Sequence, residues 1–353
     1  MTTSVNSGDF DNGPLRCPLT GSRLQLLDNA EEVLSINMAL KNGDSTLAAG
    51  AIPGGVIDAV LISATGQHKY PIIAGIPCLL DDFRIVKPAE NDPTKEISLQ
   101  MSALQRKQWV AFSKQYEKWL CEPDGIITRV QEEFQRRNAS LLSKKGATIL
   151  DVGNGGATSN QQLGKEIASF IETFYALDSS YPMLTRNGIN EHQILGDATR
   201  IPLSDKSIDF VIINNTLHHF GLHKDSDSSE KMKAFFDEAF RVSRNGIIGV
   251  EMLVPHIAEH IEKLFLQFLK FMPTFVYSEK FYSRLIENLG AEIVEFESIP
   301  QRKLVSPFWC GPPIMDIPFI KLPAFLTPYS FLFYHLKPGK SQDTPNLAGP
   351  PEN

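Results

Sequence analysis

The stretch from Ala147 to Asn160, ATILDVGNGGATSN, constrains the fold of this chain more than any other part of the sequence. It begins with a short apolar run, passes through Asp151 and three glycines, and reaches Thr158, which we expect to be the N-cap of a helix. Glycines let the backbone adopt positive φ and approach a ligand, and a helix N-terminus offers unpaired N–H groups. The stretch therefore predicts a strand, a ligand-binding turn and a helix.

The acid that precedes the glycines limits the charge of the ligand. A carboxylate at Asp151 would repel a pyrophosphate, whereas it suits a ligand with a cationic end. The pattern resembles the first motif of class I S-adenosylmethionine-dependent methyltransferases (type 11-like), acid-x-Gly-x-Gly-x-Gly. Asp151, Gly153 and Gly155 match this motif, and Ala157 stands where the third glycine is expected. A tight turn between strand and helix that binds no ligand is the alternative.

Two further acids each follow a predicted strand. Asp178 ends a strand predicted over 170–177, and an acid there can accept hydrogen bonds from a ribose diol. Asp197 lies in a Gly-Asp-Ala segment that is followed by Ile-Pro-Leu, which resembles the third-strand segment of the same family. The resemblance implies that Asp197 accepts from the adenine amino group and that the Ala198 backbone contacts the ring. Capping at Asp178 and an ordinary turn at Asp197 are the alternatives.

A fourth segment, SIDFVIINNTLHHF at 207–220, combines a buried strand with polar residues at its end. Its LHHF ending is typical of the same methyltransferase group, and the resemblance puts Asn214 near the donor methyl group. An oxygen or nitrogen acceptor needs a base, and histidine suits neutral pH. His218 and His219 are therefore the catalytic candidates, with a histidine that merely caps the end of the strand as the alternative.

The resemblance covers about residues 145–337 and implies the fold class and the cofactor. The fold is expected to be α/β, with a Rossmann-like, mostly parallel seven-stranded sheet, helices on both faces and an antiparallel last strand. S-adenosylmethionine is the implied cofactor. Its implied contacts are Asp151, Gly153, Gly155, Asp178, Asp197, Ala198 and Asn214.

Residues 14–83 read as a separate small α+β unit, because short apolar runs alternate with glycine and proline. The YPIIAGIPCLL tail at 70–80 resembles the zinc-ribbon-like activator subunit that partners several methyltransferases. Of the zinc ligands in that family, only Cys17 of the first motif is present here, and a structural zinc site needs four. We therefore predict that this unit holds no metal, with zinc on Cys17 and His68 as the alternative.

The remaining segments complete the expected organisation. Helical spacing over 97–120 and 126–142 predicts a linker or lid, in which Trp109, Tyr116 and Trp119 either line the pocket or pack on the sheet. Helical spacing also runs over 255–271. The expected parts are a disordered 1–13, the activator-like unit at 14–83, the helical linker at 84–146, the methyltransferase domain at 147–337 and a disordered tail at 338–353.

An insertion at 300–328 is rich in proline and phenylalanine. In the expected topology it joins the last two strands at the carboxyl end of the sheet, where ligands bind in open α/β sheets. We expect it to form an apolar wall of the acceptor pocket, with Phe308, Trp309, Ile314 and Phe319 as candidates. A dimer surface or a membrane-facing patch is the alternative.

The amino-acid composition limits the classes of molecule that the protein is expected to bind and the compartment in which it is expected to lie. The net charge of −7 argues against general binding to nucleic acid, and together with the apolar insertion it favours a hydrophobic small-molecule acceptor. The four cysteines form no C-x-x-C pair, and neither a signal peptide nor a transmembrane segment is expected, so we predict a cytoplasmic protein. Contact with a membrane surface, the oligomeric state and O-, N- or C-methylation stay open. An NAD-dependent oxidoreductase and a non-catalytic scaffold are the rival functions.

Overall fold

The computed structural model describes residues 13–27, 29–42, 46–47, 57–86, 125–155, 157–185, 192–221, 228–256, 276–311, 322–326 and 329–339. The chain forms two compact units. The first unit comprises Met1–Ile212 with Arg241–Arg244, and the second comprises Ile213–Phe240 with Asn245–Asn353. The expectations for the lid aromatics Trp109, Tyr116 and Trp119, for the helix at 255–271, and for Ile314 and Phe319 lie outside the described residues.

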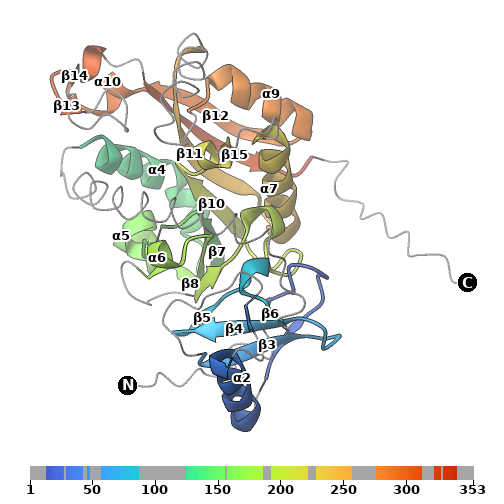
Figure 1. Cartoon of the computed structure of the whole chain (residues 1–353). Coiled ribbons are helices and arrows are strands. Elements are labelled where there is room, and N and C mark those ends of the chain that lie inside the picture. The colour runs from blue at the N-terminus through green and yellow to red at the C-terminus, as the bar shows by residue number, and fades with distance from the viewer. Residues whose placement is uncertain are drawn as a thin grey trace, which may run out of the picture. The chain divides into compact units, whose positions relative to one another are not determined.

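One seven-stranded sheet organises the fold (Figure 1), with the strand order β12-β15-β11-β10-β7-β8-β9. Strands β7, β8 and β9 are parallel to one another, whereas β15 runs antiparallel to both β11 and β12. The predicted fold class, with its antiparallel last strand, is thus confirmed. The strands are β7 (Ala147–Val152), β8 (Ile171–Asp178), β9 (His192–Leu195), β10 (Phe210–Asn214), β11 (Ile247–Leu253), β12 (Glu292–Pro300) and β15 (Ser330–Lys337).

Capping residues mark the start of one helix and the end of another, as predicted. Thr158 caps the helix after the glycine turn, and it forms a reciprocal capping box with Gln161. Gly290 ends the helix before β12 with φ of 61°, a left-handed conformation that favours glycine. The helices are α4 (Ile126–Leu142), α5 (Ser159–Ala168), α6 (Tyr181–Leu184), α7 (Ser228–Val242) and α9 (Glu279–Leu289). No helix in the described part of the chain has both the length and the apolar character that crossing a bilayer requires.

The N-terminal part of the first unit has its own four-stranded antiparallel sheet, in the order β1-β3-β4-β5. Its core contains the buried side chains of Leu61, Tyr70 and Ile72. Its strands are β1 (Leu24–Leu26), β3 (Ala59–Ser63), β4 (Lys69–Ile73) and β5 (Ile76–Pro77). It also contains α2 (Ala30–Asn42), the pair β2 (Thr46–Leu47) and β6 (Ile85–Val86), and the 3-10 turn η1 (Asp81–Phe83).

This N-terminal sheet is joined to β9, the edge strand of the large sheet, by backbone hydrogen bonds. Cys78 forms a parallel bridge with Leu195, and the Leu79 N–H donates to the Leu195 carbonyl at 2.7 Å. A second bridge joins Leu15 to Leu203 in antiparallel orientation. An exposed edge strand is a template for unwanted pairing, so these contacts protect the end of the sheet.

The two cysteines described in the N-terminal part are buried and free. The Cys17 thiol lies 3.7 Å from the Tyr70 hydroxyl, and burial raises the pKa of the Cys78 thiol to about 12, which makes it unreactive. No group of three or more His, Cys, Asp or Glu side chains in the described part of the chain is arranged to hold a metal ion.

In the second unit, the insertion leaves and rejoins the sheet at the end of β11. Pro300, the last residue of β12, and Leu253, the last residue of β11, both face Ser330, the first residue of β15. The insertion therefore starts and finishes at the carboxyl end of β11. Its described elements are α10 (Gln301–Leu304), β13 (Cys310–Gly311), β14 (Leu322–Pro323) and η5 (Ala324–Leu326).

Candidate active site

The glycine turn after β7 depends on backbone conformations that other residues avoid. Gly153 and Gly155 have φ of 69° and 61°. The Gly153 N–H donates to the carbonyl of Leu177 at 2.8 Å, which ties the turn to the end of β8. A Cβ atom added to Gly155 would lie 3.3 Å from the Cε atom of Met183, so the turn is closely packed as well. Both matched glycines are therefore required by the geometry of the turn.

Asp151 lies at the carboxyl end of β7 with only 1% of its surface exposed. Its Oδ2 atom accepts a hydrogen bond from the Asn154 Nδ2 group at 2.7 Å. The pKa of the Asp151 carboxyl is raised to about 7, mainly by burial and also by the charge of Asp178, while hydrogen bonds from the amides of Asn154 and Gln162 oppose the rise. The carboxyl is thus poised to ionise fully when a cationic group approaches it.

Asn154 has an unusual environment that the sequence pattern did not single out. Its Nδ2 group donates to Asp151 and also to the Ala157 carbonyl at 2.8 Å, and these two acceptors fix the orientation of the amide. Its Oδ1 atom is then buried with no hydrogen-bond partner among the described residues. A buried acceptor without a donor is costly, so this oxygen is a place for a ligand N–H or O–H group.

Asp178 ends β8 and faces the same turn. Its Oδ2 atom accepts from the Gly155 N–H at 2.9 Å, and its Oδ1 atom accepts from the Ser180 N–H at 2.8 Å. A carboxylate has about four lone-pair sites, so it can accept from several donors at once. Asp178 thereby supports the glycine turn and presents oxygen atoms beside it.

Asp197 and Ala198 follow β9, next to Asp178 along the edge of the sheet. The Gly196 N–H donates to the Asp178 carbonyl at 3.0 Å. Asp197 is exposed and caps the 3-10 turn η3 (Ala198–Arg200), with its Oδ1 atom accepting from the Thr199 N–H and hydroxyl at 2.8 Å each. The structure therefore brings Asp151, Asp178 and Asp197 to the ends of three adjacent strands.

The groups around this turn fit the cofactor that the resemblance implies. A buried acid, an amide oxygen with no partner among the described residues and a second carboxylate are all acceptors, and the glycines carry no side chain that would keep a ligand from the backbone. This set suits a ligand with an ammonium end and a sugar diol, and it opposes a pyrophosphate. S-adenosylmethionine has this ammonium end and no pyrophosphate, whereas a dinucleotide has the pyrophosphate and lacks the ammonium group.

The second unit contains a different polar cluster at the end of β10. Asn214 is the last residue of β10 and is half-buried. Asn215 follows with φ of 50°, and its Oδ1 atom accepts from the Met252 N–H at 3.0 Å. Asparagine tolerates the left-handed conformation better than most residues, which explains its use where the chain leaves the strand.

Glu251 on β11 is the centre of this cluster, and it is completely buried. Its Oε1 atom accepts from the N–H groups of Thr216 and Leu217 at 2.7 and 2.8 Å. Its Oε2 atom lies 3.1 Å from Nδ1 of His218, which belongs to the 3-10 turn η4 (Leu217–Gly221). A carboxylate only accepts, so His218 carries its proton on Nδ1 and keeps Nε2 as the basic nitrogen.

The sequence offered a weak signal for Glu251. It is the one acid in the strand IIGVEML, whose residues are all buried. Such a position is expensive for a carboxyl group unless donors surround it, so an acid in a buried strand predicts a polar network. The donors of that network could not be identified from the sequence, because they come from a segment distant from Glu251 along the chain.

His219 differs from His218. Its ring centre lies 4.0 Å from that of His218. Burial, and to a lesser extent the charge of His218, lowers the pKa of His219 well below its usual value. His219 is therefore neutral and a weak base at neutral pH.

The described candidates of the insertion are Phe308 and Trp309. Phe308 is 79% exposed, whereas Trp309 is half-buried and its carbonyl accepts from the Ala324 N–H at 2.9 Å. Both belong to the segment that leaves the sheet at the end of β11, two residues beyond Glu251.

The raised pKa of Asp151 predicts pH-dependent cofactor binding. The ionised carboxyl attracts an ammonium group, and the ionised fraction rises as the pH passes through about 7. Affinity for S-adenosylhomocysteine, which carries that ammonium group, should therefore increase by about tenfold from pH 6 to pH 8. Calorimetric titrations at several pH values measure this, and Asp151→Asn should remove the dependence. A flat profile in the unchanged protein would contradict the role of Asp151.

Comparison with known proteins agrees with this architecture. Residues 150–248 match a protein family described as methyltransferase domain. A search among curated protein sequences gave no match.

Among solved structures, the chain is similar to magnesium protoporphyrin IX methyltransferase of Synechocystis with bound SAH. The identity is 15%, the match covers 60% of this chain and 84% of the other, and the TM-score is 0.39. It is also similar to a SAM-dependent methyltransferase of Aquifex aeolicus. Here the identity is 16%, the match covers 57% of this chain and 88% of the other, and the TM-score is 0.34. A third similar structure is the complex between the Haloferax volcanii Trm112 methyltransferase activator and a methyltransferase. The identity is 14%, the match covers 63% of this chain and 97% of the other, and the TM-score is 0.38.

Proposed function

We propose that this protein uses S-adenosylmethionine to methylate a hydrophobic small molecule, with His218 as the base; the match of residues 150–248 to a family described as methyltransferase domain supports the methyl transfer. The observation that carries the proposal is the acceptor-rich turn around Asp151, Asn154 and Asp178. When bound, the cofactor supplies an electrophilic methyl group on a sulfonium.

The glycine-turn residues bind the methionine part of the cofactor. Asp151 attracts the ammonium group, and Gly153 and Gly155 let the backbone approach. The buried Oδ1 atom of Asn154 accepts from the same ammonium group, which satisfies an atom that is otherwise orphaned. Asn154 is thus added to the contacts that the resemblance implies.

The acids at the next two strand ends bind the nucleoside part. Asp178 accepts from the ribose hydroxyls and also from the N–H groups of Gly155 and Ser180, because a carboxylate can accept from several donors. Asp197 accepts from the adenine amino group, and the Ala198 backbone contacts the ring. Asn214, at the end of β10, completes the cofactor contacts.

His218 removes the proton of an oxygen or nitrogen acceptor. Glu251 fixes the Nδ1–H tautomer, so the basic Nε2 nitrogen is available in the same orientation in every turnover. The low pKa of His219 favours His218 over its neighbour for this role. Methyl transfer is otherwise a matter of positioning, which the buried Glu251 network supports.

The chemical class of the methyl acceptor is inferred from the insertion and from the net charge. The insertion presents Phe308 and Trp309 from a segment that starts at the carboxyl end of β11, so an apolar molecule is favoured over a polar one. A dimer contact or a membrane surface would use the same side chains. The net charge of −7 argues against a nucleic acid acceptor.

The N-terminal part acts as a built-in, metal-free equivalent of a methyltransferase activator subunit, and it stabilises the edge of the sheet through Cys78, Leu79 and Leu195. The buried, free thiols of Cys17 and Cys78 suit the reducing cytoplasm.

An acceptor screen tests the proposed activity. The full chain is incubated with S-adenosylmethionine carrying a labelled methyl group and with paired libraries of apolar and polar alcohols, phenols and amines. We expect label in apolar products. Trp309→Ala should give much less label, whereas Glu287→Gln, an exposed control in the second unit, should give as much label as the wild type. Labelled polar products alone would contradict the acceptor class, and cofactor binding without any turnover would favour a scaffold.

A further inference from the structure

The first unit contains a polar cavity of about 430 Å³ that the proposed methyl transfer does not use. Two arginines, five hydroxyl-bearing side chains, Gly13 and Pro14 line it, and no acidic residue does. Thr148, one of the lining residues, is the second residue of β7, whereas the glycine turn follows the last. The cavity therefore lies about 13 Å along the strand from the cofactor turn, toward the other end of the sheet.

The two arginines, Arg16 and Arg23, face each other across an antiparallel bridge. The Cys17 N–H donates to the Ser22 carbonyl, and the Leu24 N–H donates to the Leu15 carbonyl, on either side of the pair. This pattern makes Arg16 and Arg23 a non-hydrogen-bonded pair, in which side chains leave the same face about 5 Å apart at Cβ. The two guanidinium groups therefore extend from the same side of the bridge, where both can contact one anion.

Hydroxyl groups on the large sheet form another side of the cavity. Thr148 of β7 is the register partner of Thr173 of β8, so the two side chains point to the same face. Tyr175 lies two residues after Thr173 and shares that face. The cavity therefore combines fixed positive charges with hydroxyl donors from a rigid sheet.

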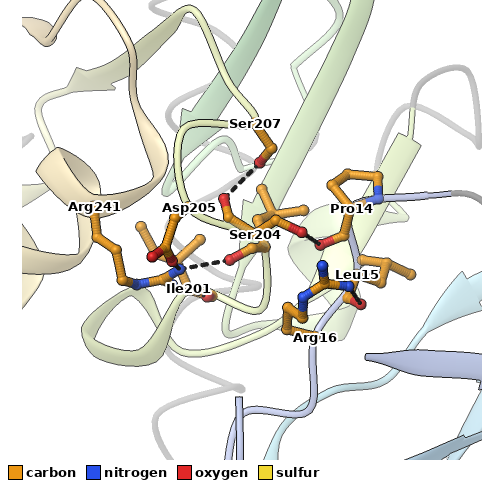
Figure 2. Close-up of polar contacts among 9 residues, drawn as sticks. Pro14, Leu15, Arg16, Ile201, Ser204, Asp205, Ser207 and Arg241 are labelled. Carbon is orange, nitrogen blue, oxygen red and sulfur yellow. Dashed lines mark hydrogen bonds and ion pairs between the residues drawn. The ribbon is translucent and has the colours of Figure 1, made fainter. Parts of the chain in front are cut away.

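The remaining wall is held in place by a network of hydrogen bonds (Figure 2). The Ser204 hydroxyl donates to the Pro14 carbonyl at 2.9 Å, and the Ser207 hydroxyl donates to the Ser204 carbonyl at 2.7 Å. Arg241 binds the same turn, donating to the carbonyls of Leu203 and Ile201 at 2.8 Å each. The segment that carries Arg16 is thereby fixed against the 201–207 turn before any ligand binds.

Two acids close to lining residues in the sequence or by hydrogen bond, Asp205 and Asp209, are engaged by other arginines. Asp205 forms an ion pair with Arg241 at 2.7 Å, and Asp209 forms one with Arg244 at 3.1 Å. Asp209 also accepts from the Thr148 N–H at 2.8 Å. Within the described residues, the Arg16 guanidinium donates a hydrogen bond to the Leu15 carbonyl at 3.3 Å, and it carries five N–H donors in all.

We propose that this cavity binds a small phosphate-bearing molecule, with its phosphate between Arg16 and Arg23. Guanidinium groups bind phosphate oxygens in charge-assisted pairs, and two of them match a dianion better than a single carboxylate. The hydroxyls of Thr148, Thr173 and Tyr175 supply further donors. The volume is that of a small-molecule site, and the polar lining suits a charged ligand.

Titration of the full chain with inorganic phosphate and with glycerol phosphate tests this proposal. We expect saturable binding of both at one site, weakened about tenfold by Arg16→Gln or Arg23→Gln, as the loss of one charge-assisted pair predicts. Thr173→Val, on the sheet side of the cavity, should weaken binding as well, and it provides a second variant should an arginine variant fold poorly. Arg136→Gln removes an exposed arginine of the same unit and should change nothing.

Two results would overturn the proposal. One is equal phosphate binding by the wild type and by folded Arg16→Gln, Arg23→Gln and Thr173→Val chains. The other is binding of a single-stranded RNA oligonucleotide without binding of phosphate or glycerol phosphate, which would point to a nucleic acid surface. Asp178→Ala should leave phosphate binding unchanged, and this separates the cavity from the cofactor turn.

Discussion

Replacing Asp178 with alanine is expected to weaken binding of S-adenosylhomocysteine by about 100-fold, which corresponds to about 3 kcal/mol. The carboxylate is proposed to accept from the ribose hydroxyls, and it already accepts from the N–H groups of Gly155 and Ser180. The substitution therefore removes ligand contacts and also releases the glycine turn. Calorimetric titration of the variant against the unchanged protein measures the loss.

Two variants separate the lost contact from general damage. Asp178→Asn keeps the shape and one acceptor oxygen, so it should lose less affinity than Asp178→Ala. Asp237→Ala removes a partly exposed acid that pairs with Lys233 on α7, and it should bind like the wild type. Unchanged affinity in a folded Asp178→Ala chain would remove Asp178 from the cofactor site.

Glu251→Gln is expected to lower kcat by about 100- to 1000-fold while cofactor affinity stays the same, as for other substitutions that reverse a catalytic histidine tautomer. The glutamine oxygen can still accept from Thr216 and Leu217, but its amide N–H faces Nδ1 of His218. His218 must then accept at Nδ1 and carry its proton on Nε2, which removes the base. The rate with an acceptor found by the screen measures the loss.

A second readout for Glu251 needs no acceptor. Nitrogen NMR of labelled protein distinguishes the two histidine tautomers, and it should report Nδ1–H for His218 in the wild type and Nε2–H in Glu251→Gln. Glu287→Gln is the matched control on the surface of the same unit. His218→Ala combined with Glu251→Gln should be no slower than either single variant, because the pair acts as one device. Full activity of Glu251→Gln with the changed tautomer would contradict a base at His218.

The sequence was informative wherever a local pattern decides the geometry. Glycines before a predicted N-cap at Thr158 defined the turn, and the capping box with Gln161 confirms where α5 begins. Acids after apolar runs located the ends of β7, β8 and β9, because parallel strands end at one edge of the sheet. The antiparallel β15 followed from the resemblance and is confirmed by its register with β11 and β12.

Features that depend on pairing between distant segments were not predictable from the sequence. Asn154 stands at a variable position of the motif, and its orphaned oxygen appears only once its amide is fixed by Asp151 and Ala157. Glu251 meets His218 because two segments 33 residues apart pack together. The cavity beside Arg16 likewise requires β7, β8 and the N-terminal segment to lie next to one another.

The central claim is that the acceptor-rich turn around Asp151 and Asp178 binds S-adenosylmethionine. Its most direct test is a calorimetric titration of the full chain with S-adenosylhomocysteine at pH 8, with NAD as the comparison ligand. We predict binding of one S-adenosylhomocysteine per chain with a dissociation constant on the order of micromolar, or about −8 kcal/mol, and no binding of NAD. Binding of NAD alone, or of neither ligand by a folded chain, would contradict the claim.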